Sequence, residues 1–354
     1  MKYDNCTNFP GGGGRLMKSS SSRENLPLIG PATNFLRFPA RNPASVLKGL
    51  KGMARAFAEA ELAIARCEFV RGKELSEVLL GDDHYILAAV RIGIISAIGL
   101  GDLRFFDRVV KALADYRKRL PHPEAAVGIE LTEAWIRQWL WIETGYPEWM
   151  YRFDLTSVPE PWRQSAAYLG MKIRTVRGVF ESAYAASSLL LNFICSRQEG
   201  ITAACAYAKI ACAISCRETN RKDEMLQWLD DVVRTLAPHR ILLPFLLFMY
   251  GSRKSPVEEI LAEVAPEQLP RYRKLSQDYY RNLIRARNRY AGERTTESLT
   301  FREFYLAMLL KRNLSYKELA EKFGLSIGRM RNLVSILYEK LHIHGKTELK
   351  GLVW

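Results

Sequence analysis

The sequence contains no apolar run of the ~20 residues that a membrane-spanning helix requires. Its longest apolar segments are shorter or are interrupted by a charge, and we expect each of them to be a helix buried in a protein core. These segments are 87–100, 183–195, 201–216 and 241–250. The N-terminus also lacks an apolar stretch followed by a small-residue cleavage site, so we expect no secretory signal and a cytoplasmic protein.

Residues that bind metals or perform catalysis are also scarce. The 5 histidines show no H-E-x-x-H spacing, and the chain has neither a G-x-S-x-G motif nor paired carboxylates in a glycine-framed loop. Asp82-Asp83-His84 follows a glycine and is expected to be a solvated turn. Gly11–Gly14 is followed by Arg15 instead of the G-K-[S/T] ending of a phosphate loop. We therefore expect no enzyme, no cofactor and no metal site.

The 6 cysteines are scattered through apolar, helix-like sequence. Cys205, Cys212 and Cys216 share one face of a predicted helix, but their neighbours are alanine and isoleucine, and a second pair of zinc ligands is missing. We therefore expect the cysteines to be buried free thiols in a reducing compartment.

A group of tryptophans in the middle of the chain admits two interpretations. The rings stack on a ligand, or they pack between helices as part of the core; we favour the core. The group consists of Trp135, Trp139, Trp141, Trp149 and Trp162.

Positive charge is concentrated at the C-terminal end. Lys and Arg number 52 against 38 Asp and Glu, a formal net charge of +14. From Arg271 to Trp354 there are 18 basic and 8 acidic side chains, so this quarter of the chain supplies most of the excess. A local basic excess is typical of a phosphate-binding surface. The alternative is a solvated basic helix pair without a polyanionic partner.

The composition divides the chain into four parts. Residues 1–40 are rich in glycine, serine and proline and are expected to be a flexible tail. Residues 41–290 show helical periodicity with a break every 10 to 25 residues; Pro43–Val70 is predicted to be one long amphipathic helix. Residues 291–298 are small and polar and are predicted to be a linker to a last domain at 299–354.

In the middle part, the distance between successive helix breaks is typical of stacked antiparallel helix pairs. One tetratricopeptide-like unit is predicted, with helices at Ala203–Cys216 and Glu224–Leu236 and a turn at Asn220 between them. A further inter-helix turn is predicted at 99–103. We therefore predict an all-α chain, with an irregular tetratricopeptide-like α-solenoid at 41–290. For the helix at 271–290, we favour a solvated helix that caps the solenoid over a basic helix beside DNA.

The last domain carries clear helix boundaries. Thr300–Glu303 and Ser315–Glu318 both match the S/T-x-x-E capping box, in which a hydroxyl and a carboxylate satisfy backbone N–H groups at a helix start. Gly324 is placed to end the second helix, and Ser326 to cap the third. This spacing predicts three short helices and a fourth stub, with a helix-turn-helix among them.

The same domain resembles the LuxR/FixJ family of helix-turn-helix domains. The match covers about 50 residues, a seventh of the chain, without insertion. It consists of Leu299-Thr300-Phe301-Arg302-Glu303, Asn313-Leu314-Ser315-Tyr316-Lys317-Glu318-Leu319-Ala320, Leu325-Ser326, Leu337-Tyr338-Glu339-Lys340-Leu341 and Thr347-Glu348-Leu349. The resemblance implies a four-helix DNA-binding domain whose recognition helix is Ile327–Leu341.

Helical periodicity assigns the faces of that recognition helix. The predicted core face consists of Met330, Val334, Leu337 and Leu341, with Leu333 and Ile327 on its two sides. The opposite face holds Gly328, Arg331, Asn332, Ser335 and Glu339, and Arg329 lies at its side. Arginine and asparagine pair with guanine and adenine, and capping serines lie where phosphates bind. The predicted DNA-binding residues are Ser315, Lys317, Ser326, Arg329, Arg331, Asn332 and Ser335.

The chain departs from the family pattern at four positions. Arg329 and Leu333 replace a threonine and a histidine of the family's recognition helix, so no target sequence is carried over. Asn313 replaces a glycine, which is tolerable because asparagine also adopts left-handed backbone. Tyr305 replaces a glutamate in the first helix.

The helical middle part is similar, more weakly, to the segment before the DNA-binding domain of MalT-type LuxR regulators. The residues are Tyr168–Arg174 and His239–Phe245, and the upstream ATPase of those regulators has no counterpart here. The resemblances imply a bacterial transcription regulator that binds double-stranded DNA as a homodimer and takes a small-molecule or protein effector at the helical-repeat domain. The alternative is a scaffold whose C-terminal bundle binds a protein.

Overall fold

The computed structural model describes residues 26–28, 37–38, 43–119, 123–195, 201–248, 255–292 and 299–352. Within these residues the chain is helical, apart from one antiparallel bridge between β1 (Arg37–Phe38) and β2 (Ile201–Thr202). The all-α prediction is confirmed. The predicted tail at 1–40 and linker at 291–298 lie largely outside the described residues.

Five helices build the first half of the helical body, a name kept below for residues 43–292. They follow a 3₁₀-helix (Pro43–Leu47) and are α1 (Gly52–Ala65), α2 (Phe69–Leu79), α3 (Ile86–Leu100), α4 (Leu103–Arg119) and α5 (Pro123–Trp139). α3 packs against α1, α2, α4 and α5, and its side chains from Ile86 to Ile98 are buried all around the helix. Gly101, with a φ of 68°, ends α3, so the predicted turn at 99–103 is confirmed.

The predicted single helix at Pro43–Val70 is wrong. Gly49, after the 3₁₀-helix, and Gly52, the first residue of α1, have φ angles of 79° and 54°. Cys67, with a φ of 58°, separates α1 from α2. Left-handed backbone cannot continue a right-handed helix, whereas the apolar spacing in the sequence runs on through these breaks.

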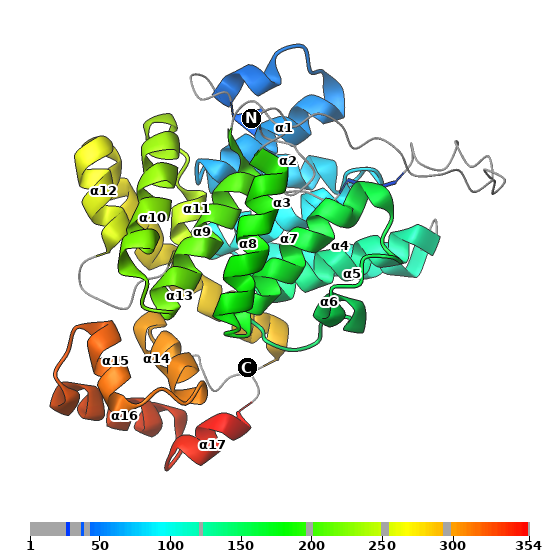
Figure 1. Cartoon of the computed structure of the whole chain (residues 1–354). Helices are drawn as coiled ribbons and strands as arrows, with labels where there is room; N and C mark the ends of the chain where they lie inside the picture. The colour runs from blue at the N-terminus through cyan, green and yellow to red at the C-terminus, as the bar shows by residue number, and fades with distance from the viewer. Residues whose placement is uncertain are drawn as a thin grey trace, which may run out of the picture.

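The second half of the body is a series of helices that pack in chain order. They are α6 (Glu148–Arg152), α7 (Glu160–Val176), α8 (Phe180–Cys195), α9 (Ala203–Glu218), α10 (Lys222–Leu236), α11 (Leu243–Leu246) and α12 (Pro256–Val264), with 3₁₀-helices at Ala237–His239 and Pro266–Gln268. α7 packs on α8, α8 on α9 and α9 on α10, as the green part of Figure 1 shows. Asn220 forms the turn between α9 and α10 with a φ of 60°, which confirms the predicted helix, turn and helix there.

The four apolar runs have different outcomes. The run at 87–100 falls in α3 and is buried up to Ile98, while Leu100 is 38% exposed; that at 201–216 begins in β2 and continues as α9, which is buried along most of its described length. The run at 183–195 is helical but only one face is covered, since Leu191 is buried while Leu189 is 70% exposed. The described part of the run at 241–250, residues 241–248, contains the four-residue α11, so the prediction of a single buried helix is wrong there. In the part of the chain that the structure describes, no helix is long and apolar enough to cross a membrane.

α13 (Leu269–Ala291) connects the body to the C-terminal helices. It packs against α3, α4, α11 and α12 and buries Tyr272, Tyr279 and Leu283. The Trp139 indole N–H donates to the Tyr279 hydroxyl at 2.7 Å. The favoured prediction of a solvated helix at 271–290 is therefore wrong, because Tyr272, Tyr279 and even Arg287 are buried in the core, and only one side of α13 is exposed.

Four helices form a C-terminal unit, the name kept for residues 299–352: α14 (Phe301–Lys311), α15 (Tyr316–Phe323), α16 (Ile327–Leu341) and α17 (Lys346–Gly351). They enclose a second hydrophobic core, which also takes in Ile284 of α13. The capping boxes of Thr300 and Ser315 are both present, and Gly324 ends α15 with a φ of 61°. The predicted helix boundaries in this unit are confirmed.

Candidate nucleic-acid interface

The inner face of α16 supplies the core of the C-terminal unit. Met330, Val334, Leu337 and Leu341 are buried, as their spacing predicts. Ile327 is 44% exposed, so its predicted place beside the core face is wrong. It is the first residue of the helix and lies beyond the packing against α14 and α15.

The outer face of α16 is polar and open. Arg329, Arg331, Asn332 and Ser335 are all exposed, at helical spacings that place them around the side opposite the buried stripe. Ile336, four residues after Asn332, adds an apolar side chain that is 44% exposed. In Figure 1, α14 and α15 lie between α16 and the helical body. The outer face is therefore not covered by the body.

The starts of α15 and α16 differ in their electrostatics. Ser326 accepts a hydrogen bond from the Arg329 N–H at 3.3 Å, and the first turn of α16 contains no acidic residue. Ser315 caps α15 in the same way, but there the Glu318 carboxylate accepts from the Ser315 N–H at 2.7 Å. Because a carboxylate already lies at the start of α15, the start of α16 is the better site for an anion.

The cations of the C-terminal unit fall into two groups. One group is used internally: Lys340 pairs with Glu303 at 2.8 Å, and Lys311 donates to the Leu352 carbonyl. The side chains of the other group are exposed and make no ion pair with any residue that the structure describes. Its members on α15 and α16 are Lys317, Arg329 and Arg331. Unpaired positive charge is thus left on the surface that includes the outer face of α16.

A buried charge cluster joins the C-terminal unit to the body. Glu218, at the end of α9, has a side chain that is only 3% exposed and lies 2.6 Å from Arg217 and 3.1 Å from Lys322 of α15. The Tyr305 hydroxyl of α14 donates to the same carboxylate at 2.8 Å. Burial alone would raise the pKa of Glu218, but the two cations and the Tyr305 hydrogen bond lower it to about 2. The carboxylate is therefore ionised at neutral pH.

Arg312, the residue that follows α14, makes a second contact across this junction. Its guanidinium donates to the Val176 carbonyl at the end of α7, lies 3.6 Å from Glu143 and stacks on the Phe180 ring at 5.3 Å. Gly178, with a φ of 76°, leaves room for the Arg312 side chain, because a Cβ at this position would lie 2.9 Å from the Arg312 Nε. Two helices of the C-terminal unit are thus docked on three helices of the body.

The junction residues were not among the predicted site residues. In the sequence, Tyr305 stands out only as a departure from the family pattern. In the structure its hydroxyl donates to the Glu218 carboxylate, so this residue contacts the body. Glu218 and Arg217 look like ordinary charges at a helix end. The contacts join segments far apart in the sequence, and no local pattern signals them.

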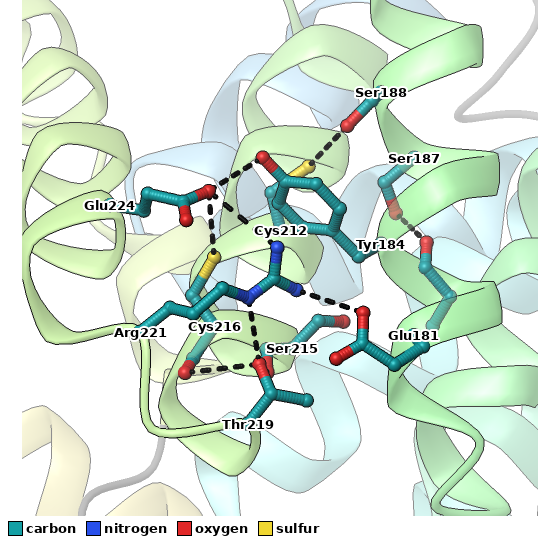
Figure 2. Close-up of polar contacts among 11 residues, drawn as sticks. Glu181, Tyr184, Ser187, Ser188, Cys212, Ser215, Cys216, Thr219, Arg221 and Glu224 are labelled. Carbon is teal, nitrogen blue, oxygen red and sulfur yellow. Dashed lines mark hydrogen bonds and ion pairs between the residues drawn. The ribbon is translucent and has the colours of Figure 1, made fainter.

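The α9–α10 turn is held in place by Arg221 (Figure 2). Its guanidinium lies 4.0 Å from the Tyr184 ring centre, and its Nε donates to the Thr219 hydroxyl at 2.9 Å. The guanidinium also approaches Glu181 at 3.4 Å, while the Tyr184 hydroxyl donates to Glu224 at 2.8 Å. These contacts fix the end of α9, and hence the junction cluster, against α8.

The cysteines fit the prediction of buried free thiols where their side chains are described. Cys67, Cys205, Cys212 and Cys216 are free and buried, and the other two side chains, of Cys6 and Cys195, lie outside the described set. Burial raises the pKa of Cys212 to about 12 and that of Cys216 to about 11, so neither is a reactive thiolate. Among the described residues, no group of histidine, cysteine and carboxylate side chains is arranged to hold a metal.

The tryptophans are mainly packing residues. Trp135, Trp139 and Trp162 are at most 5% exposed, and the Trp135 and Trp139 rings stack with centroids 4.8 Å apart. The core interpretation is confirmed for these three. Trp141 is half-buried and lines a small recess at the junction.

No family model matches this chain, and no curated protein or solved structure matches it either.

Proposed function

We propose that this chain is a bacterial, cytoplasmic, DNA-binding transcription regulator of the LuxR type, with α15 and α16 as its helix-turn-helix. α16 enters the major groove, where Arg331 pairs with guanine and Asn332 with adenine. Ser335 and the exposed Ile336 are placed for a hydrogen bond to a base and for contact with a thymine methyl group. Lys317, Arg329 and the capping serines Ser315 and Ser326 contact phosphates.

One observation carries this proposal: the base-pairing side chains of α16 are exposed together with cations of α15 and α16 that make no ion pair with a described residue. Arg329, Arg331, Asn332 and Ser335 are exposed on α16, and Lys317 adds its charge from the start of α15. Other cations of the unit, such as Lys322 and Lys340, are held in ion pairs. A helix bundle with only a packing role has no need to keep its free cations together beside asparagine and serine.

The body would receive the signal. In this proposal the helix pairs α7–α8 and α9–α10 are tetratricopeptide-like repeats, and an effector bound to them changes how the C-terminal unit is held. The charged junction at Glu218 supports such coupling, since a docked unit and a released unit differ in several buried contacts. Because helix-turn-helix proteins usually bind two-fold sites, we expect a homodimer on DNA.

Binding of the full chain to genomic fragments at several salt concentrations tests the proposal. We expect affinity to fall steeply with salt, and the slope of log K against log salt to shrink by about one when Lys317→Ala removes a phosphate contact. Lys111→Ala, an equal charge change on the exposed surface of α4, should leave the slope unchanged. Weak binding that is insensitive to salt in all three proteins would reject the proposal.

The second candidate is a scaffold whose C-terminal unit binds another protein. Three exposed apolar side chains favour it: Tyr316 at 40%, and Ile327 and Ile336 at 44% each. On this alternative, DNA binding is absent, and replacing Ile327 and Ile336 by serine removes binding to the partner protein.

A further inference from the structure

A cleft of about 500 Å³ lies where the C-terminal unit meets the end of α9. Its volume falls within the range of small-molecule sites. Phe180 of α8 and Leu314, between α14 and α15, are half-buried and give it apolar walls from the body and from the C-terminal unit. A molecule in this cleft would therefore contact both parts of the protein.

A second, narrow recess of about 20 Å³ adjoins the cleft beneath the junction. The two spaces share Phe180, Arg217, Glu218, Tyr305 and Arg312 as lining residues. The recess has room for about one oxygen-sized group.

Lys172 of α7 lines the recess and is the unusual residue of this region. It is 3% exposed, yet it makes no hydrogen bond or ion pair with any described residue. Burial lowers its pKa to about 8, so at neutral pH it still carries its proton. An ammonium group buried without a partner is costly.

The groups around Lys172 also favour an anion. Arg217 of α9 and Arg312, the residue after α14, also line the recess, but they are paired with Glu218 and Glu143, so Lys172 is the lining cation that lacks a counter-charge among the described residues. Glu218 is already neutralised by Arg217 and Lys322. One further buried donor in the lining, Arg312 Nε, has no hydrogen-bond partner among the residues that the structure describes.

We infer that the junction is a binding site for a small organic carboxylate with an apolar tail. One carboxylate oxygen enters the recess, where Lys172 and Arg312 Nε are available as donors. The tail lies in the cleft against Phe180 and Leu314. A neutral water in the recess would accept a hydrogen bond but would leave the charge of Lys172 uncompensated. The site itself does not depend on DNA binding, and if the chain is a regulator this carboxylate is its effector.

Calorimetry of the full chain with octanoate and 3-phenylpropionate tests the inference without DNA. A bound carboxylate raises the pKa of Lys172, so titration at about pH 8.5, just above its pKa of about 8, should show proton uptake when buffers of different ionisation enthalpy are compared. Octan-1-ol, which lacks the charge, should bind at least about tenfold more weakly.

Lys172→Met keeps the length and apolar stem of the side chain and removes the buried charge. We expect it to fold with a melting temperature no lower than that of the wild type, to bind octanoate about tenfold or more weakly, and to show no proton uptake. Lys111→Met, on the exposed surface of α4, should behave as wild type. Absence of binding by both carboxylates, binding without proton uptake, or equal binding by Lys172→Met would overturn the inference.

Discussion

Lys322 of α15 lies 3.1 Å from the Glu218 carboxylate at the end of α9, with side chains only 16% and 3% exposed. Lys322 also donates to the Arg217 carbonyl at 3.3 Å. This pair links the core of the C-terminal unit to that of the body, beside the hydrogen bond from Tyr305 to the same carboxylate. The position of the outer face of α16 relative to the body therefore depends on a buried ion pair.

Glu218→Gln should loosen the docking of the C-terminal unit. The change leaves Arg217 and Lys322 buried without their counter-charge, and losing one partner of a buried pair typically costs about 3–5 kcal/mol. Hydrogen exchange should therefore become faster at the junction, in α14 and α15, while the centre of α3 stays protected. Glu321→Gln is the matched control, because Glu321 is exposed and makes no ion pair with a described residue. Equal exchange in both variants would contradict the role given to Glu218.

Docking should weaken in acid through the same carboxylate. The pKa of Glu218 is lowered from 4.5 to about 2, so its stabilising contribution is present above about pH 4.5 and is lost as the pH falls through about 2. The unfolding free energy of wild type minus that of Glu218→Gln should shrink over this window. A difference that stays constant from pH 5 to 2 would show that Glu218 is not held as the anion.

The core of the body contains a buried ion pair between Glu61 and Arg91, with side chains 4% and 3% exposed. Glu61→Ala should lower the unfolding free energy by about 3–5 kcal/mol, because Arg91 is then buried without its counter-charge. The double change Glu61→Leu/Arg91→Met should recover most of this loss. Glu77→Ala, which removes the exposed partner of Arg108, should cost less than about 1 kcal/mol. Urea titrations would measure all three, and a similar loss in the single and double core variants would refute this account.

Substitution by alanine should have opposite effects on stability at Gly99 and at Gly328. A Cβ at Gly99 would lie 2.1 Å from the Phe69 ring, so Gly99→Ala should destabilise the body by about 1–3 kcal/mol or more through overpacking. A Cβ at Gly328, on the outer face of α16, meets nothing within 4 Å, so Gly328→Ala should stabilise the unit by up to about 1 kcal/mol. Thermal unfolding would distinguish the two, and a stable Gly99→Ala protein would contradict the close packing of α3 against α2.

Local signals predicted the C-terminal unit well. The bounds of α16 agree with the sequence prediction at both ends, Ile327 and Leu341, because a serine cap and a buried stripe with helical spacing are encoded within one segment. Asn313 has the left-handed backbone, with a φ of 66°, that its replacement of a glycine required. Whether the outer face of α16 binds DNA stays a prediction.

Contacts over long sequence distances were not predictable. Lys172 lies between Met171 and Ile173 in an apolar helix segment, and its spacing from Tyr168 and Val176 places it on the core side; only the fold reveals that it lacks a partner. The break at Cys67 was hidden because the apolar spacing continues through it. The prediction that α13 is solvated was based on its many charged residues. Its actual burial is set by tyrosines that pack toward α3, a contact that the sequence does not indicate.

Selection of binding sites from random duplex DNA tests the central claim most directly. The full wild-type chain should enrich one sequence as a two-fold site with half-sites about one helical turn apart. The Arg331→Ala/Asn332→Ala variant should bind DNA with a similar salt dependence but should lose the preference at the corresponding base pairs. No enriched sequence with the wild type, or the same enriched sequence with the variant, would contradict base recognition by α16.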